Sequence, residues 1–244
     1  MTKPLLLDLF SGAGGAARGY ADAGFDIIGV DIAPQKHYPY SFYQANALDV
    51  LNMLLADNGL WQGYALDDFA AIHASPPCQE YSSTRHLRNA TTMKPRIREK
   101  LVKQVYTALR ATDLPYVIEN VPGSPMPDSI TLCGSMFGLP IRRHRWFACS
   151  HYLYAPGKCQ HSDGFVNVVG GKVRGYGLMR SPTRTFLEYG KTLRKSEGQY
   201  RKEVGQAAMG IDWMTIAEMS EAIPPAYTHW IGRQLMAIIE CEVA

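Results

Sequence analysis

One cysteine of this chain stands where a catalytic nucleophile would be useful. Cys78 follows two prolines in the Ser-Pro-Pro-Cys-Gln sequence of residues 75–79, after the apolar stretch 69–74. The prolines fix their own backbone torsions and push the residues before them out of the helical region, so the thiol is presented on a stiff loop. Holding a thiol in place lowers the barrier of a covalent step, which indicates nucleophilic catalysis. A small buried hydrophobic residue is the other interpretation of a single cysteine, and the flanking residues disfavour it.

A glycine-rich turn near the start of the chain is typical of a cofactor site. Residues 11–15 read Ser-Gly-Ala-Gly-Gly and join a strand-like run to a helix-like segment. Glycines let the backbone approach a ligand closely, and the start of the following helix offers free N–H donors. The turn lacks the spacing of a dinucleotide motif and the lysine of a P-loop, whereas Asp31, which ends the next apolar run, suits ribose hydroxyls. This combination favours the adenosine of S-adenosylmethionine over NAD or ATP, and a tight turn without a ligand is the alternative.

Strand-like and helix-like segments alternate along the first half of the chain. This alternation predicts an α/β fold with a doubly wound, mostly parallel sheet. Ligands bind at the carboxyl ends of the strands in such sheets, and Asp31, Cys78 and Glu119 fall at such ends. The expected strands are 5–10, 27–31, 43–45, 70–74 and 115–121, and the expected helices are 16–23, 50–56 and 97–112.

Composition narrows the class of protein. The chain has 244 residues, a net charge of +3 and five cysteines, an odd number that favours a reducing compartment over a disulfide framework. No apolar run approaches the ~20 residues of a membrane span, and the N-terminal residues do not resemble a signal peptide, so we expect a cytoplasmic protein. Basic residues concentrate in 85–103 and 191–202. Such runs bind polyanions or form solvated helix faces, and neither run alone distinguishes the two.

The segment 148–203 differs in character from the rest. It is rich in Gly, Tyr and His without a helical period, so we predict a small irregular lobe that contains a flexible basic loop at 170–177. Residues 1–147 together with 204–244 are expected to form the catalytic and cofactor-binding domain. The lobe also contains four residues of metal-ligand type, but their Cys-x-His spacing is tighter than that of zinc fingers, so we predict no metal site and a polar surface that touches DNA. These four residues are Cys149, His151, Cys159 and His161.

Taken together, several segments resemble the motifs of the DNA (cytosine-5) methyltransferases, in the same order and with similar spacing. Residues 222–227 look like the last motif of that family, which folds back against the cofactor. The short forms carried by phages and prophages look most similar, and 148–203 is then the target-recognition lobe. The resemblance implies an S-adenosylmethionine-dependent enzyme that acts on double-stranded DNA as a monomer, in the cytoplasm of a bacterial host. The segments that carry it are 8–15, 76–79, 119–121 and 143–147.

The resemblance also implies which residues hold the cofactor. The glycine-rich turn wraps the methionine part, Asp31 binds the ribose and Ile32 packs on the adenine. Asn46 stands where the family usually has an aspartate, and its carbonyl can still accept from the adenine amino group. Glu221 stands where the family often has asparagine, which leaves its contact open. The implied cofactor residues are Phe10, Gly12, Gly14, Gly15, Asp31, Ile32, Asn46, Ala47, Glu221 and Ala222.

The implied catalytic residues surround the target cytosine. Cys78 attacks carbon 6 as a thiolate, favoured by Arg143 or Arg145, and Glu119 bonds to N3 and the exocyclic amino group. Asn120 holds the loop or the carboxyl. Because a stacked base cannot reach such a site, the cytosine must be flipped out of the duplex. The residues expected to contact DNA are Gln79, Ser82, Ser83, Arg85 and Arg88 in the catalytic loop, and Lys172 and Arg174 in the lobe.

Three other functions fit parts of this pattern. The first is a catalytically silent protein that binds DNA or cofactor. Such a protein would not need reactive residues, and their presence in this chain argues against it. A pyrimidine-nucleotide C5 methylase of the thymidylate synthase type also uses a Pro-Cys nucleophile but lacks the glycine-rich turn. A methyltransferase mechanism with a modified donor is a further alternative, for which Asn46 is a weak indication.

Overall fold

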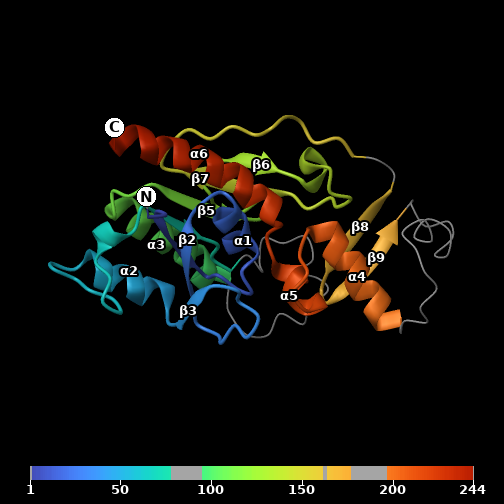
Figure 1. Cartoon of the computed structure of the whole chain (residues 1–244), viewed down its shortest axis with the longest axis horizontal. Coiled ribbons are helices and arrows are strands. Elements are labelled where there is room, and N and C mark those ends of the chain that lie inside the picture. The colour runs from blue at the N-terminus through green and yellow to red at the C-terminus, as the bar shows by residue number, and fades with distance from the viewer. Residues whose placement is uncertain (1, 78–94, 162–163, 177–196, 244) are drawn as a thin grey trace.

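A mostly parallel sheet forms the centre of the structure, a computed structural model that describes residues 2–77, 95–161, 164–176 and 197–243. Its seven strands lie in the order β3-β2-β1-β4-β5-β7-β6 (Figure 1). Neighbouring strands from β3 to β5 are parallel, and β7 is antiparallel to both β5 and β6. The predicted α/β sheet is therefore confirmed. The strands are β1 Leu5–Leu9, β2 Asp26–Asp31, β3 Ser41–Gln44, β4 Ala71–Ala74, β5 Tyr116–Asn120, β6 Ile130–Leu132 and β7 Arg145–Cys149.

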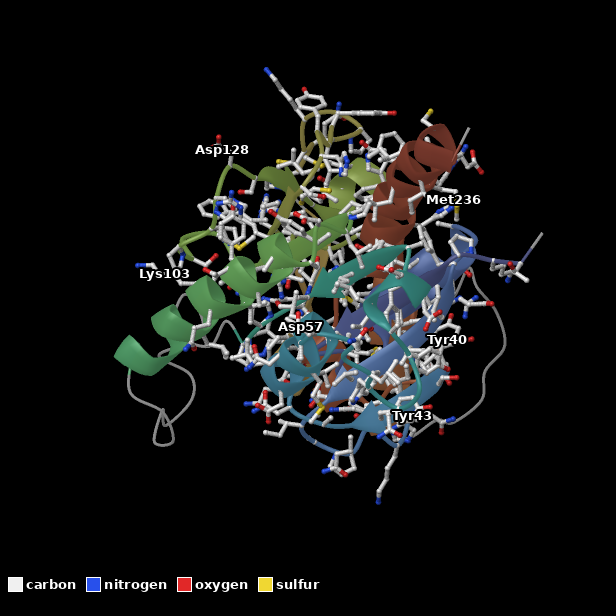
Figure 2. The ribbon with its side chains drawn as sticks, turned by 90° about the vertical axis from the view of Figure 1, so that its left-hand side faces the viewer. Tyr40, Tyr43, Asp57, Lys103, Asp128 and Met236 are labelled. Carbon is white, nitrogen blue, oxygen red and sulfur yellow. The ribbon has the colours of Figure 1, made fainter. Side chains whose placement is uncertain are left out.

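Helices cover both faces of this sheet. On one face, α2 (Ala47–Leu55) and α3 (Pro95–Ala111) bury apolar side chains against alternate residues of the strands. On the other face, α1 (Gly15–Asp22) and α6 (Pro225–Val243) do the same. Figure 2 shows α3 and α6 on opposite sides of the strands. Spacings of three and four residues create these apolar stripes, as in Val102, Val105 and Leu109 of α3.

The C-terminal helix α6 packs directly on the N-terminal helix α1. Gly19 allows the close approach, because a β-carbon at this position would collide with the Pro225 carbonyl and the Thr228 hydroxyl. Thr228 Oγ1 also donates to the Ala16 carbonyl oxygen at 2.8 Å. This contact brings the end of the chain back to the glycine-rich turn. In the described part of the chain, no helix, α6 included, has the length and apolar character that crossing a membrane requires.

An antiparallel hairpin replaces part of the lobe that we expected to be irregular. It consists of β8 (Phe165–Val169) and β9 (Lys172–Tyr176). Gly170 and Gly171 both have positive φ, as a two-residue hairpin turn requires, so the prediction of a flexible loop at 170–177 was wrong for 170–176. Apolar residues on one face of the hairpin, including Val166, Val168 and Val173, form a separate small core with the helices α4 (Glu197–Met209) and α5 (Ile216–Glu221).

The segment that follows β7 does not lie with this hairpin. It runs beside α6 in Figure 1, where Trp230 Nε1 donates to the Tyr154 carbonyl and Leu153 is buried against the main sheet. The hairpin begins further along the chain, where the Val166 N–H donates to the Pro140 carbonyl at 2.6 Å. The division of the chain at residues 147 and 204 stays a prediction.

A buried polar cluster lies on the α1 face of the sheet. Asp8 of β1 is fully buried, its Oδ2 accepts from the Tyr38 hydroxyl at 3.0 Å, and its Oδ1 has no hydrogen-bond partner among the described residues. His73 lies opposite Asp8 on β4 and shares a 3.0 Å hydrogen bond with the Tyr20 hydroxyl. Burial raises the pKa of Asp8 to about 7 and lowers that of His73 to about 3, so near neutral pH the histidine carries no charge to offset the carboxylate.

We expect Asp8→Asn to remove a pH dependence of stability. Between pH 4 and 7 the unfolded state has lost the Asp8 proton while the folded state keeps it, so the free energy of unfolding falls as pH rises, by up to about 1.4 kcal/mol per unit. Above pH 7 the difference is constant. Urea denaturation of both proteins from pH 4 to 8 measures this, and the variant should gain stability relative to the wild type as pH rises to 7. Parallel pH profiles would contradict the assignment.

Candidate active site

The loops that carry the predicted site meet at the carboxyl edge of the sheet. β2 and β3 lie on one side of β1, and β4 lies on its other side. The strand order therefore changes direction at β1, and ligands of such sheets bind at the point where the direction changes. The Ser75 N–H donates to the Leu9 carbonyl at 3.1 Å, and its hydroxyl donates to the Phe10 carbonyl at 3.1 Å. The start of the cysteine segment is thus tied directly to the start of the glycine-rich turn.

Strained backbone shapes the glycine-rich turn. Phe10, Gly12 and Gly14 all have positive φ, which is unusual for a phenylalanine and common at ligand sites. Gly14 is the N-cap of α1, and a β-carbon there would press on Tyr38 and Pro39. The turn therefore presents main chain and the N-terminus of α1, with little side-chain bulk, as the sequence predicted.

Asp31 organises the turn from the neighbouring strand. Its Oδ2 accepts from the Gly12 N–H at 3.0 Å, and its Oδ1 accepts from the Ala33 N–H at 2.9 Å. A carboxylate has about four acceptor positions, so two remain for ribose hydroxyls. Ile32, beside it, is 71% exposed and offers an apolar surface on which an adenine ring can pack. These donors, acceptors and apolar surface fit S-adenosylmethionine.

Asn46 has a local role that our sequence analysis missed. Its Oδ1 accepts from the Leu48 N–H at 3.0 Å, which makes it the N-cap of α2. Asparagine is among the most favoured N-cap residues, and its position just before a helical stretch was the available signal. One acceptor position of Oδ1 remains for the adenine amino group. Asn46 is exposed and its neighbour Ala47 is buried in the core.

The last motif folds back on the turn. A β-carbon at Gly15 would lie 3.1 Å from that of Ala222 and would collide with the Ile223 backbone, so the two segments touch. Glu221 is exposed at the end of α5. Trp213, which our prediction did not include, donates from Nε1 to the Ala13 carbonyl at 2.8 Å and so holds the turn from the other side.

We expect Asp31→Asn to weaken S-adenosylmethionine binding by about 1.5–3 kcal/mol, the value of a hydrogen bond to a charged group. The amide preserves the shape but loses the charge and half of the acceptor capacity that ribose hydroxyls and the Gly12 N–H share. Isothermal titration calorimetry measures the change. Asp57→Asn, at an exposed position after α2 (labelled in Figure 2), is the matched control and should bind normally. Equal affinity of the two variants would exclude Asp31 from the cofactor site.

Glu119 and Arg145 form a buried ion pair at the end of β5. In the β5–β7 ladder Glu119 lies opposite Phe147, so Arg145, two residues before Phe147, points to the same face. Arg145 Nε lies 2.9 Å from Glu119 Oε1, and the Glu119 residue is 6% exposed. Burial raises the pKa of the Glu119 carboxyl, and Arg145 and Arg143 oppose the rise. The carboxyl is therefore easier to protonate than an exposed glutamate, while Arg145 favours its charged form.

Asn120 is hydrogen-bonded to the start of the cysteine segment. Its Nδ2 donates to the Pro76 carbonyl at 3.0 Å, and its Oδ1 accepts from the Val121 N–H at 2.9 Å. The side chain is fully buried. Of the two roles considered from the sequence, holding the loop or holding the carboxyl, these contacts match the first.

Arg143, which we predicted to contact the target cytosine, makes hydrogen bonds to backbone carbonyls. Its Nη1 donates to the Val168 carbonyl at 3.2 Å and its Nη2 donates to the Ser220 carbonyl at 2.8 Å. These contacts attach β8 and α5 to the start of β7. Tyr227, which the prediction did not include as a site residue, donates its hydroxyl to the Arg143 carbonyl at 2.6 Å. A contact between Arg143 and the target base stays a prediction.

Several predicted residues fall outside the described part of the chain. These are Cys78, Gln79, Ser82, Ser83, Arg85 and Arg88, and the description ends at the exposed Pro77. Lys172 and Arg174 are described: both are exposed on β9 and, being two apart, they project on one side while Val173 between them is buried. The hairpin thus presents two cations on its outer face.

The sheet order, the strained turn at β1 and the acid at the end of β2 define an α/β methyltransferase of the S-adenosylmethionine-dependent class. The family model of the C-5 cytosine-specific DNA methylases matches residues 5–129, more than half of the chain. The chain belongs to this family, and S-adenosylmethionine is its cofactor.

Known proteins extend this comparison. The Type II methyltransferase M.XorII of Xanthomonas oryzae pv. oryzae is 32% identical over 87 residues, which cover 34% of this chain and 20% of that protein. The matched segment is thus a fifth of the length of that relative. The S. pombe Dnmt2 methyltransferase has a TM-score of 0.54 at 12% identity, covering 97% of this chain and 99% of that one. The Entamoeba histolytica methyltransferase EhMeth has a TM-score of 0.51 at 13% identity, with both chains fully covered. At such identities the two structures support the fold alone.

Proposed function

We propose that this chain transfers a methyl group from S-adenosylmethionine to carbon 5 of cytosine in DNA, through a transient bond between Cys78 Sγ and carbon 6. The observation that supports this most is the buried Glu119–Arg145 pair beside Asn120, whose amide holds the Pro76 carbonyl two residues before the cysteine. In this proposal the Glu119 carboxyl, the Arg145 guanidinium and the Cys78 thiol act together on the pyrimidine. Attack on carbon 6 of a pyrimidine requires these groups.

Cys78 acts as the nucleophile in this mechanism. Its thiolate adds to carbon 6 and makes the ring an enamine that is nucleophilic at carbon 5. Arg145 supplies a positive field that favours the thiolate. When bound, S-adenosylmethionine supplies the methyl group as an electrophilic sulfonium. Carbon 5 takes up this methyl group, its proton is lost to solvent, and expulsion of the Cys78 thiolate then restores the aromatic ring.

Glu119 stabilises the ring while charge develops on it. With its pKa raised by burial, the carboxyl can donate a hydrogen bond to N3 and accept one from the exocyclic amino group. Arg145 keeps the carboxyl in place and limits its rise in pKa. A hydrogen bond that strengthens as charge develops in the transition state lowers the barrier. A hydrogen bond that is equally strong in the bound substrate does not.

Double-stranded DNA is the proposed substrate, and the cytosine is flipped into the site. In this proposal the loop that closes on DNA begins at Gln79, and the lobe 148–203 with Lys172 and Arg174 contacts the duplex. The expected loop extended to Arg98, but residues 95–98 belong to helix α3. One catalytic domain serves one flipped base, so we propose that the chain acts as a monomer. A small lobe reaches few base edges, which predicts a short recognition sequence.

The reaction product tests the proposed function. Purified protein is incubated with S-adenosylmethionine and unmethylated plasmid, and the DNA is digested and analysed by mass spectrometry. We expect 5-methylcytosine, with no methyl transfer to free dUMP under the same conditions. Transfer to dUMP alone would favour the nucleotide methylase, a different added mass would indicate a modified donor, and unmodified DNA with retained cofactor binding would favour a silent binder. Bisulfite mapping of the plasmid then gives the recognised sequence.

A further inference from the structure

Four side chains with metal-binding atoms meet beside the β6–β7 end of the sheet. They are Cys133, His144, Cys159 and His161, and one ligand atom from each lies within 4.8 Å of all the others. They come from three separate parts of the sequence. Two of them, Cys159 and His161, belong to the set that we considered and set aside at the level of sequence. The other two members of that set, Cys149 and His151, are not part of the cluster.

Strand register places the first two ligands. Leu132 of β6 pairs with Arg145 of β7 in an antiparallel ladder, so the next residues outward, Cys133 and His144, face each other where the ladder ends. The turn between them, which contains a short 3-10 helix at Gly134–Phe137, closes this end of the hairpin. The pairing explains why residues eleven positions apart in the sequence present their side chains together.

A second segment supplies the other two ligands. Cys159 Sγ lies 3.7 Å from His144 Nε2, and His161 Nε2 lies 3.4 Å from Cys133 Sγ, so each side chain of this segment contacts one from the strands. The two imidazole rings meet edge to face with centroids 5.0 Å apart. The Gln160 N–H donates to Ser135 Oγ at 3.2 Å, which ties the segment to the turn after β6.

The distances suit tetrahedral zinc. With Zn–S of about 2.3 Å and Zn–N of about 2.0 Å, a sulfur and a nitrogen on one tetrahedron lie about 3.5 Å apart, and the two S···N contacts observed here are 3.4 and 3.7 Å. Two thiolates and two imidazoles are a common donor set for structural zinc. Ser135 Oγ donates to Cys133 Sγ at 3.5 Å, the kind of outer contact that orients a metal ligand.

We propose that Cys133, His144, Cys159 and His161 bind one Zn²⁺ ion with a structural role. The ion would join the end of β6, the start of β7 and the segment that returns from α6 toward the hairpin. This proposal replaces our expectation that the chain has no metal site. It also has a positional consequence, because His144 lies between Arg143, which holds β8 and α5, and Arg145, which pairs with Glu119. Zinc would fix the backbone from which both arginines project.

Metal content tests the proposal independently of methyl transfer. The full chain is purified under reducing conditions without chelator, and zinc is measured by inductively coupled plasma mass spectrometry. We expect about one ion per chain, and replacement by Co²⁺ should give the intense visible absorption of tetrahedral cobalt with thiolate ligands. A protein that contains no zinc as purified and takes up none from a zinc buffer would overturn the proposal. So would an intact-mass measurement that finds Cys133 and Cys159 joined in a disulfide.

Matched variants identify the ligands. Cys159→Ser and His161→Ala should lose bound zinc, whereas Cys149→Ser and His151→Ala, a cysteine and a histidine outside the cluster, should keep it. His161 is exposed, so its replacement removes a ligand with little loss of packing, and circular dichroism checks that each variant is folded. Equal zinc content in all four folded variants would contradict the assignment. Loss of zinc from Cys149→Ser with retention in Cys159→Ser would contradict it as well.

Discussion

Cys78→Ala should abolish methyl transfer while leaving S-adenosylmethionine binding intact. Without a thiolate to add to carbon 6, carbon 5 stays a poor nucleophile, and loss of the nucleophile from a covalent mechanism lowers kcat by up to about 10⁶-fold. Single-turnover transfer of tritiated methyl groups to DNA measures the effect. Because the proposed cofactor contacts come from the glycine-rich turn and Asp31, calorimetry should give the wild-type affinity for the cofactor.

Two controls make the prediction specific to Cys78: a variant of another cysteine and an oligonucleotide that traps the covalent intermediate. Cys149→Ala, which removes a half-buried thiol at the end of β7, should retain activity. An oligonucleotide that contains 5-fluorocytosine should form a covalent adduct with the wild type and with Cys149→Ala in the presence of donor, and none with Cys78→Ala. An adduct on another residue, or methyl transfer by Cys78→Ala, would exclude Cys78 as the nucleophile.

Glu119→Gln should lower kcat by about 10²–10³-fold, the cost of removing one group that stabilises a developing charge. The amide keeps the shape of the carboxyl but cannot transfer a proton to N3, and Arg145 loses its ion-pair partner. The loss should be in kcat more than in KM for DNA, because the interaction strengthens as the ring takes up charge. Steady-state kinetics on an unmethylated plasmid separates the two constants.

Folding must be checked in this variant. Breaking a buried ion pair costs about 3–5 kcal/mol, so thermal denaturation and cofactor calorimetry should accompany the kinetics. Glu240→Gln, at an exposed position of α6, is the matched control and should behave as wild type. A folded Glu119→Gln protein with normal kcat would mean that the carboxyl does not act on the base.

The sequence was sufficient for the strands that form the middle of the sheet. β1, β2, β4 and β5 are short, mainly apolar runs, as expected for strands buried on both faces. β6 was missed because its three residues show no alternation. The hairpin was missed because Gly170 and Gly171 look like a flexible loop until the valines on either side are seen to face one core.

For the site, the residue types were predictable and their partners were not. The sequence indicated that Glu119 follows a buried strand, but the pairing with Arg145 depends on the register of β7, which only the fold defines. In the same way, Cys133 and His144 become neighbours through strand pairing, so no spacing in the sequence indicated the cluster. Arg143 was predicted at the base because the motif contains it, whereas its bonds to backbone carbonyls depend on where β8 and α5 pack.

The two hydrogen bonds from Ser75 to the main chain of residues 9 and 10 have a mechanical consequence. They join the start of the cysteine segment to the glycine-rich turn, and the amide of Asn120 holds the Pro76 carbonyl next to them. Under the proposed mechanism, these three bonds would constrain the start of the nucleophile's segment relative to the methyl donor before either substrate arrives. If a bulkier donor displaced Phe10, the hydrogen bonds of Ser75 would pass that shift to the cysteine segment, so redesign for such donors has to begin at Ser75 rather than at the proposed cofactor contacts alone.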